Sequence, residues 1–394
     1  MPRLHCCNKM IMIDLEEYIA ENNLRNRELE IVENGYDPLS GHGCCGERVS
    51  CGDAMLPVSL LHEHPHYLTL DGQSRDVLRI AHDFEYWCAR CVTVKDKSSG
   101  RLVPLILNRG QRKLLAAMER QRAAGAPIRI ILLKARQWGG STLTQMYMAW
   151  IQIVHRKGWN SIILSHQLTG TLAIKRMLAN LVDNYPVELL DGGKSLTMRS
   201  AGSPNVLDLH PRGCTVVLGS SRSEDAVRGT DLAMAHLSEV AFWKDTGEDV
   251  VRSVGGAIAR LPLTVIVMES TANGYDKVFH SQWQRAVAGE SDKSAVFVPW
   301  YEIPLYRREV SEPAKLIAEM DDYEHDLWAR GLTLEMIAWY HDKRREYGKH
   351  RSMQAEYPTT PEEAFGTSGD MKRERVPLPA DLSELVPATD AAMV

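Results

Sequence analysis

The sequence lacks any apolar run of the about 18 residues that a membrane-spanning helix needs. Residues 1–12 also lack the apolar core of a secretory signal peptide, because histidine, cysteine, asparagine and lysine interrupt them. We therefore expect no membrane span and a cytoplasmic location. The chain also lacks a strong excess of charge of one sign. Its net charge of −5 argues against a basic nucleic-acid coat but leaves room for a local basic surface.

Cysteine is scarce beyond the first quarter of the chain, and without a secretory signal the eight cysteines are expected to be reduced. Cys88 and Cys91 have the CxxC spacing of a zinc-ligand pair. Three histidines alternate upstream of them, at His62, His64 and His66. Residues 83–91 nevertheless have the pattern of an amphipathic helix, and a partner CxxC or HxxxH is missing. We expect buried free thiols, with a structural zinc site as the alternative.

The hydrophobic pattern changes at about residue 100. Helical spacing at 14–32 and 74–91 predicts a helical N-terminal extension over residues 1–100. Over residues 101–300, short apolar runs alternate with helical segments, which predicts an α/β core domain with a mainly parallel central sheet flanked by helices. The expected strands are 128–133, 161–165, 214–218, 232–237, 263–268 and 295–299, and the expected helices are 142–155, 168–181 and 248–260.

Beyond this core the chain becomes helical and charged. Residues 301–370 predict a helical lid or linker subdomain, with one amphipathic helix at 333–347. Residues 371–394 contain three prolines and little periodicity, so we expect a tail.

The sharpest local pattern is residues 130–142, where a buried strand runs into a glycine-containing loop and the loop runs into a helix. Gly139 and Gly140 allow backbone N–H groups to approach phosphate oxygens, and the following helix offers its positive N-terminus. Ser141 or Thr142 would place a hydroxyl on Mg²⁺. This arrangement predicts a phosphate-binding loop, with an ordinary strand-to-helix turn as the alternative.

The loop departs from the standard GxxxxGK[ST] pattern, because Gly140 stands where the lysine is usual. Lys134 and Arg136 lie at the start of the loop instead, and a long basic side chain from there would reach the phosphates. The segment KARQWGGST, residues 134–142, resembles the deviant Walker A loop of phage terminase large subunits. The resemblance continues over roughly residues 102–369.

The resemblance implies a P-loop NTPase of the ASCE type that uses ATP and Mg²⁺. Residues 107–112 resemble the segment that recognises adenine, with Gln111 as the amide that both donates and accepts. The alternative for Gln111 is a solvated helix residue. The implied nucleotide-binding residues are Gln111, Lys134, Arg136, Gln137, Gly139, Gly140, Ser141 and Thr142.

Residues 232–239 resemble a Walker B strand, which usually ends in Asp-Glu. Ser238 stands at the aspartate position, where its hydroxyl would bind a metal-bound water without contributing charge. Glu239 is the implied catalytic base, with a surface acid as the alternative. Together with Ser141, Ser238 completes the expected metal site.

Two further segments resemble parts of the same motor. Arg228 matches an arginine that acts on the ATP of a neighbouring subunit, and Arg222 competes for this role. Either arginine is otherwise a solvated loop residue. Residues 265–274 resemble the coupling motif, where Thr271 or Asn273 would sense the γ-phosphate; the alternative is a strand-end turn with Asn-Gly.

Residues 356–365 resemble the segment that closes the ATPase domain, and we assign no chemistry to them. Thr360 before Pro361 predicts a helix start there.

The resemblance also implies the function. It implies ATP-driven translocation of double-stranded DNA into a viral procapsid, in the cytoplasm of a bacterial host. The implied partners are a portal protein, a small terminase subunit and further copies of the chain in a ring, usually of five. No nuclease activity is expected, because the carboxylates after residue 369 lie on a segment too short for the nuclease domain that would hold two metal ions.

Two other functions remain open. A helicase-like ATPase would need a second motor domain, which the residues after 300 do not indicate. A nucleotide-binding scaffold with little hydrolysis is suggested by Ser238 and by the missing loop lysine.

Overall fold

The computed structural model describes residues 35–96, 100–190, 193–221, 231–243 and 247–366. These residues belong to two compact units. The larger unit comprises Gly35–Pro304 together with 349–366, and the smaller unit is Leu305–Gly348. The helix predicted at 14–32 and the predicted tail lie outside the described residues.

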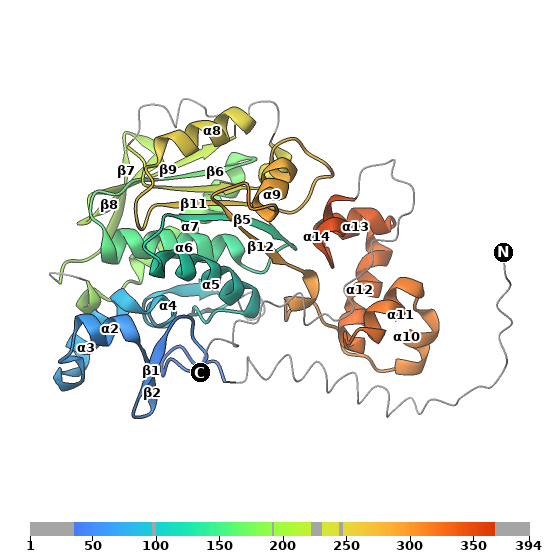
Figure 1. Cartoon of the computed structure of the whole chain (residues 1–394), viewed down its shortest axis with the longest axis horizontal. Helices are drawn as coiled ribbons and strands as arrows, with labels where there is room; N and C mark the ends of the chain where they lie inside the picture. Colours follow the sequence, from blue (N-terminus) through green and yellow to red (C-terminus); the bar gives the residue numbers. More distant parts are fainter. Residues whose placement is uncertain (1–34, 97–99, 191–192, 222–230, 244–246, 367–394) are drawn as a thin grey trace, which may run out of the picture. The chain divides into compact units, whose positions relative to one another are not determined.

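An eight-stranded sheet forms the centre of the larger unit, as Figure 1 shows. The strand order is β12-β5-β11-β10-β6-β9-β8-β7, and all neighbours from β12 to β9 run parallel, whereas β8 and β7 are antiparallel. The strands are β5 (Ile128–Lys134), β6 (Ser161–Ser165), β7 (Thr197–Ala201), β8 (Ser203–His210), β9 (Cys214–Ser220), β10 (Met234–Ser238), β11 (Val265–Ser270) and β12 (Ser294–Val298). The predicted α/β fold with a mainly parallel sheet is confirmed.

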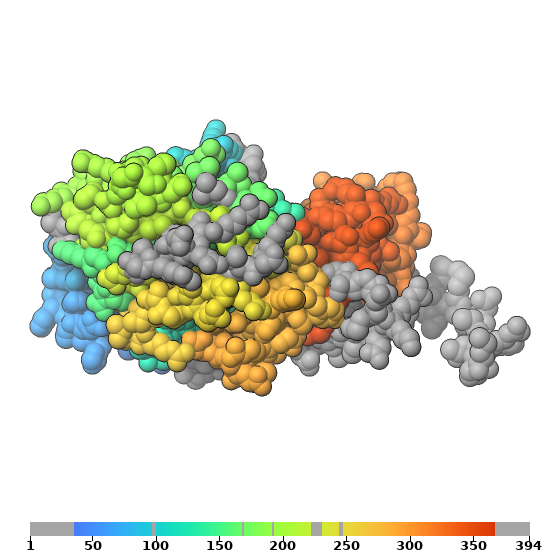
Figure 2. All heavy atoms as spheres, turned by 90° about the horizontal axis from the view of Figure 1, so that it is seen from above, coloured from blue at the N-terminus to red at the C-terminus, as the bar shows by residue number. Residues whose placement is uncertain are grey.

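Helices cover both faces of this sheet because its central strands are buried on both sides. One face packs against α5 (Arg109–Ala123), α6 (Gly140–Trp150) and α7 (Leu168–Asp183). The other face packs against α8 (Gly247–Ala257), α9 (Phe279–Val287) and the short α14 (Pro361–Phe365). In the view from above, the segments of β7–β9 (yellow-green) and of α8 and α9 (yellow to orange) are all visible at the surface of the unit (Figure 2).

Alternation along the strands decides which side chains reach which layer. Ile131 and Leu133 of β5 join Leu237 of β10 in the core beneath α8 and α9. The side chains between them on each strand therefore point to the other layer, toward α5, α6 and α7. His236 and Ser238 on β10 consequently point toward α6.

The described part of the N-terminal segment contains two short hairpins as well as helices. Its elements are β1 (Arg48–Cys51), β2 (Ala54–Pro57), α2 (Val58–Glu63), α3 (Gly72–His82), α4 (Phe84–Cys91), β3 (Thr93–Lys95) and β4 (Leu102–Pro104). The prediction of one helix over 74–91 was wrong, because Asp83 interrupts it with φ −130° and ψ 91°. The buried carboxylate of Asp83 caps α4 by accepting from the Tyr86 amide at 3.2 Å.

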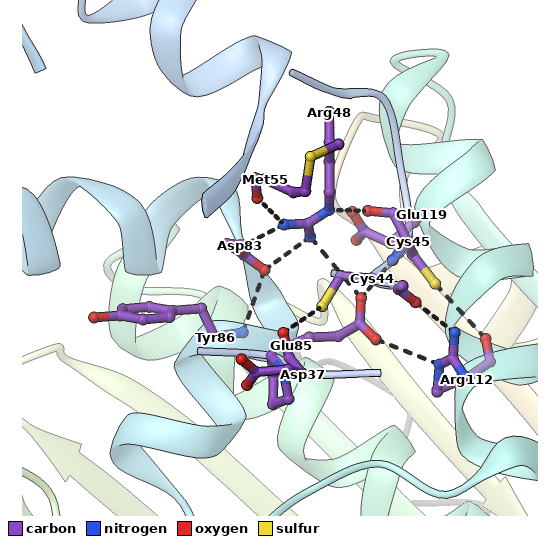
Figure 3. A network of polar contacts seen from close by, with 12 residues as sticks. Asp37, Cys44, Cys45, Arg48, Met55, Asp83, Glu85, Tyr86, Arg112 and Glu119 are labelled. Atoms are coloured by element: carbon purple, nitrogen blue, oxygen red, sulfur yellow. Dashed lines mark hydrogen bonds and ion pairs between the residues drawn. The ribbon is translucent and has the colours of Figure 1, made fainter. Parts of the chain in front are cut away.

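A buried charge network attaches the β1 hairpin and the residues just before it to the start of α4, as the close view in Figure 3 shows. The Arg48 guanidinium lies 2.9 Å from the Asp83 carboxylate, and Glu85 accepts from the Cys45 amide at 2.6 Å. For Asp83 these partners outweigh burial and lower the pKa of its carboxyl, whereas burial prevails at Glu85 and raises its pKa. Cys88 and Cys91 are buried on α4, and burial raises the pKa of Cys91 to about 12, so its thiol stays protonated.

The smaller unit is built from α10 (Pro313–Glu319), α11 (Asp322–Ala329) and α12 (Leu334–Tyr347), whereas α13 (His350–Glu356) belongs to the larger unit. The predicted helix at 333–347 is confirmed, with Thr333 as its N-cap. His341 lies 3.0 Å from Glu324 and links α12 to α11. Within the described part of the chain, no helix is both long and apolar enough to cross a membrane.

Candidate nucleotide site

The loop between β5 and α6 has the backbone that a phosphate-binding loop requires. Gly139 has φ +93°, and a Cβ there would lie 2.7 Å from Nε2 of Gln111, so only glycine fits. Gln137 also has a positive φ of 58°, a conformation that costs free energy in a non-glycine residue. Because Gly139 is the N-cap of α6 and has no side chain, it cannot cap the helix itself. The positive end of α6 therefore offers its first amides to an anion.

Gln111 is a buried residue that fixes this loop. Its Nε2 donates to the Gly139 carbonyl at 3.0 Å, and its Oε1 accepts from the Asn108 amide at 3.0 Å in the capping box of α5. The alternative of a solvated helix residue is therefore wrong. Its predicted contact with adenine stays a prediction, and the amide already holds the loop in place.

Lys134, the last residue of β5, lies among carboxylates. Its Nζ is 3.2 Å from Oε1 of Glu239 and 3.9 Å from Oε2 of Glu269. Burial would lower the pKa of Lys134, but the charges of Glu269 and Glu239 raise it overall. The lysine is thus held charged at the start of the loop. The loop contains no other lysine, because Gly140 occupies the usual lysine position.

Glu269 is the centre of a polar cluster at the end of β11. Its Oε1 accepts hydrogen bonds from Ser141, from Ser238 at 3.1 Å and from Nε2 of His236 at 2.9 Å. Burial alone would raise the pKa of Glu269, but Lys134, His236 and the Ser141 hydroxyl outweigh burial and hold the pKa at about 2. The carboxylate is therefore ionised at neutral pH although it is fully buried.

The two loop hydroxyls have different surroundings. Ser141 faces Glu269, whereas the Thr142 hydroxyl donates to Sδ of Met177 on α7 at 3.3 Å. This arrangement favours Ser141 over Thr142 for the hydroxyl that meets Mg²⁺.

The loop arginine points away from this cluster. The Arg136 guanidinium lies 2.5 Å from the Glu356 carboxylate at the end of α13. The segment after Glu356 resembled the closing part of a motor domain, and Thr360 begins α14 there as predicted. Arg136 thus lies next to the closing segment.

The residues predicted to couple hydrolysis to movement follow β11 directly. Thr271 is buried, and Nδ2 of Asn273 donates to the Ala241 carbonyl at 3.1 Å. Ala241 lies two residues after Glu239, whose own backbone is left-handed with φ 57°. A cleft of about 550 Å³ is lined in part by Asn273 and Ala241, at the carboxyl ends of β10 and β11. The structure therefore connects the coupling segment to the turn that carries Glu239.

Several predicted site residues come together, and others lie elsewhere. Lys134, Ser141, Ser238 and Glu239 form one cluster, and Gln111, Gly139 and Gly140 shape the loop beside it. Arg228 and Arg222 lie outside the described residues. Sequence analysis missed Glu269, His236 and Gln145 as site residues. The sequence feature that could have identified them is a polar residue at a position where an apolar, buried residue is expected on a strand or helix.

The side chains of the cluster fit a magnesium ion, which prefers oxygen ligands and keeps several waters. The Ser141 and Ser238 hydroxyls share the Glu269 carboxylate. Its second oxygen, Oε2, is buried without a hydrogen-bond partner among the described residues. A buried carboxylate oxygen without a donor has an acceptor position that a metal-bound water would fill.

Comparison with known proteins gives fold similarities only. No protein-family model matches the chain, and no curated protein matches its sequence. Among solved structures, the large terminase ATPase domain of a Thermus phage is 15% identical with a TM-score of 0.39, covering 60% of this chain and 90% of that domain.

Two longer terminases also match. The large terminase of bacteriophage HK97 is 15% identical with a TM-score of 0.45, over 68% of this chain and 55% of that protein. A large terminase from a thermophilic bacteriophage, in complex with ADP, is 13% identical with a TM-score of 0.38, over 56% and 51%. The chain thus spans about half the length of these two proteins. The solved structures to which this chain is similar in fold thus include large terminases of three phages.

Proposed function

We propose that this chain is an ATP hydrolase that drives double-stranded DNA into a viral procapsid. One observation carries the proposal: Lys134, Ser141, Glu239 and Glu269 meet at the carboxyl ends of parallel strands, beside the open N-terminus of α6. Ligands of open α/β sheets bind at this edge. A cationic side chain, a hydroxyl and two carboxylates are the groups that phosphoryl transfer with a metal requires.

Each side chain has a distinct part in binding and hydrolysis. Lys134 exchanges its ion pair with Glu239 for a contact to the phosphates, which releases the Glu239 carboxylate toward solvent. Glu239 then orients the attacking water, and its side chain is 38% exposed, so water reaches it. Ser141 and Ser238 would hold the metal ion directly or through water. Bound Mg²⁺ would neutralise charge that develops on the transferred phosphoryl group.

The remaining roles concern adenine, coupling and partners. Gln111 contacts the base or fixes the loop that surrounds the phosphates. Thr271 or Asn273 transmits the state of the γ-phosphate to the turn that carries Glu239. Arg228 acts on the nucleotide of a neighbouring copy in a ring. A portal protein and a small terminase subunit complete the machine in the cytoplasm of a bacterial host.

Turnover of ATP by the purified chain tests this proposal. We expect Mg²⁺-dependent release of phosphate that increases when double-stranded DNA and the portal or small-subunit partner are added. Nucleotide binding without phosphate release would instead favour the scaffold, and ATP-dependent separation of duplex strands would favour a helicase. The described residues contain one mainly parallel sheet, which favours a single motor domain over a two-domain helicase.

DNA binding is expected to be independent of sequence and to weaken steeply with salt, because a motor that moves along DNA contacts phosphates. A series of affinity measurements between about 50 and 200 mM salt, on two duplexes of unrelated sequence, checks this. We expect parallel lines of log affinity against log salt for the two duplexes. A clear preference for one sequence would identify a site-specific binder.

A further inference from the structure

We propose that Glu269 provides the metal-site carboxylate that Ser238 lacks, a proposal that rests on the nucleotide-dependent function proposed above. A Walker B strand usually presents an aspartate where this chain has Ser238 on β10. Ser238 and Glu269 are directly paired residues of neighbouring parallel strands. Their side chains point to the same face of the sheet, so a carboxylate on β11 reaches the point that an aspartate on β10 would occupy.

The hydrogen bonds of Glu269 match this role. Oε1 accepts from the Ser141 hydroxyl of the phosphate loop and from Ser238 at 3.1 Å. Ser141 is the residue expected to meet Mg²⁺, so Glu269 orients the hydroxyl of the metal ligand. Three donors converge on Oε1, whereas Oε2 is buried without a hydrogen bond among the described residues. In the described part of the chain, Oε2 faces only Nζ of Lys134, at 3.9 Å, so it is the oxygen available to a metal-bound water once Lys134 turns to a phosphate.

A second layer fixes the carboxylate. Nε2 of His236 lies 2.9 Å from Glu269, and Nδ1 lies 2.5 Å from Nε2 of Gln145 on α6. When the Gln145 amide donates to Nδ1, the hydrogen of His236 is on Nε2 and is donated to Glu269. All three side chains are buried, so their orientation is set by packing as well as by hydrogen bonds. His236 and Gln145 are thus positioning residues for Glu269.

The competing role for Glu269 is a counterion of Lys134 and nothing more. The distances favour the metal role, because Lys134 is closer to Glu239 at 3.2 Å than to Glu269 at 3.9 Å. A counterion alone would also not account for the two serine hydroxyls that converge on Oε1. Once Lys134 turns to a phosphate, Glu269 needs another cation to offset its buried charge.

The test compares ADP binding by the full chain with Mg²⁺ and with a chelator, in wild type and in Glu269→Gln. In wild type we expect Mg²⁺ to tighten ADP binding. In the variant we expect this enhancement to fall by about tenfold or more, as found for groups that orient metal ligands, whereas metal-free ADP affinity changes little. Full Mg²⁺ enhancement in folded Glu269→Gln would overturn the proposal and leave Glu269 as a counterion.

Two further variants separate the roles. The exchange Ser238→Asp with Glu269→Ser returns the carboxylate to β10 and keeps a negative charge near Lys134, so we expect it to fold and to regain the Mg²⁺ enhancement. This exchange variant provides the test if Glu269→Gln does not fold. An exchange variant that folds but shows no Mg²⁺ enhancement of ADP binding contradicts the proposal. Glu302→Gln neutralises a buried glutamate that pairs with Lys113 outside the cluster, and this matched control is expected to keep the enhancement. Failure of wild type to bind ADP in either condition would instead refute the proposed nucleotide function.

Discussion

Replacing Lys134 with alanine is expected to weaken nucleotide binding by roughly 10- to 100-fold, because a charge-assisted contact contributes about 1.5–3 kcal/mol. Gly140 occupies the usual position of the loop lysine, so no neighbouring lysine of the loop takes over. ATP turnover should fall at least as much. Equilibrium binding of a fluorescent ADP analogue and steady-state phosphate release measure the two effects. Turnover within a factor of about two of wild type would show that the loop assignment is wrong.

Removing Lys134 also leaves the Glu269 carboxylate buried without its cation, which destabilises the fold. The double variant Lys134→Met with Glu269→Gln removes both charges and keeps the volumes, and such neutral replacements of buried pairs are often tolerated. It should remain folded and still lose metal-free ADP binding, whereas Glu269→Gln alone retains it. Arg136→Ala is the matched control, because Arg136 pairs with Glu356 and is 47% exposed. We expect a smaller loss there.

The sequence predicted the layers of this fold well, since strong local patterns determine them. The runs at 161–165 and 128–133 coincide with β6 and β5, because continuous apolar segments are favoured only where both faces of a sheet are covered. The antiparallel β7 and β8 were not predicted. Their residues are half-exposed and carry polar side chains, so they lack the apolar run that identified the central strands.

The sequence pointed to the candidate site only where its residues are continuous in the chain. The loop at 134–142 carries its own signal in glycines, a basic residue and hydroxyls, so its residues were proposed from one segment. Glu269 was not assigned, because its role depends on β11 lying between β5 and β10. Strand order is not encoded in any local pattern. A buried glutamate at the end of an apolar strand was visible, but its partners Ser141 and Ser238 come from distant segments.

The order of the strands also bears on the serine at position 238, where the resemblance predicts an aspartate. Because β11 is the immediate neighbour of β10, a carboxylate from either strand reaches the Ser141 hydroxyl. The negative charge expected at Ser238 is thus present in the cluster, although it is carried by a different strand. With Glu269 in the proposed role, a serine at position 238 no longer favours a scaffold without hydrolysis. The other ground for a scaffold, the missing loop lysine, is weakened by the position of Lys134 beside Glu239.

Glu239→Gln is expected to leave ATP affinity nearly unchanged while it stops turnover. Glutamine keeps the size of the side chain but cannot accept a proton from the attacking water. Its position after β10, with a left-handed backbone and a partly exposed side chain, is set by the turn and is retained in the variant. A single-turnover measurement with saturating ATP separates this loss of chemistry from a loss of binding. Wild-type turnover in the variant would exclude Glu239 as the base.

Replacing Arg228 should impair turnover in a different way from replacing Glu239, because the arginine is proposed to act on the nucleotide of a neighbouring copy. Arg228→Ala chains are expected to bind ATP and to lose about 10³-fold or more of their turnover, the scale on which such arginines act. Mixing them with Glu239→Gln chains should restore part of the activity, since some interfaces then pair an intact glutamate with an intact arginine. An arginine that acts within its own subunit gives no such recovery, because every chain lacks one essential group. If native mass measurements show mixed rings while activity never rises above that of the single variants, Arg228 has no role across the interface and Arg222 becomes the residue to test.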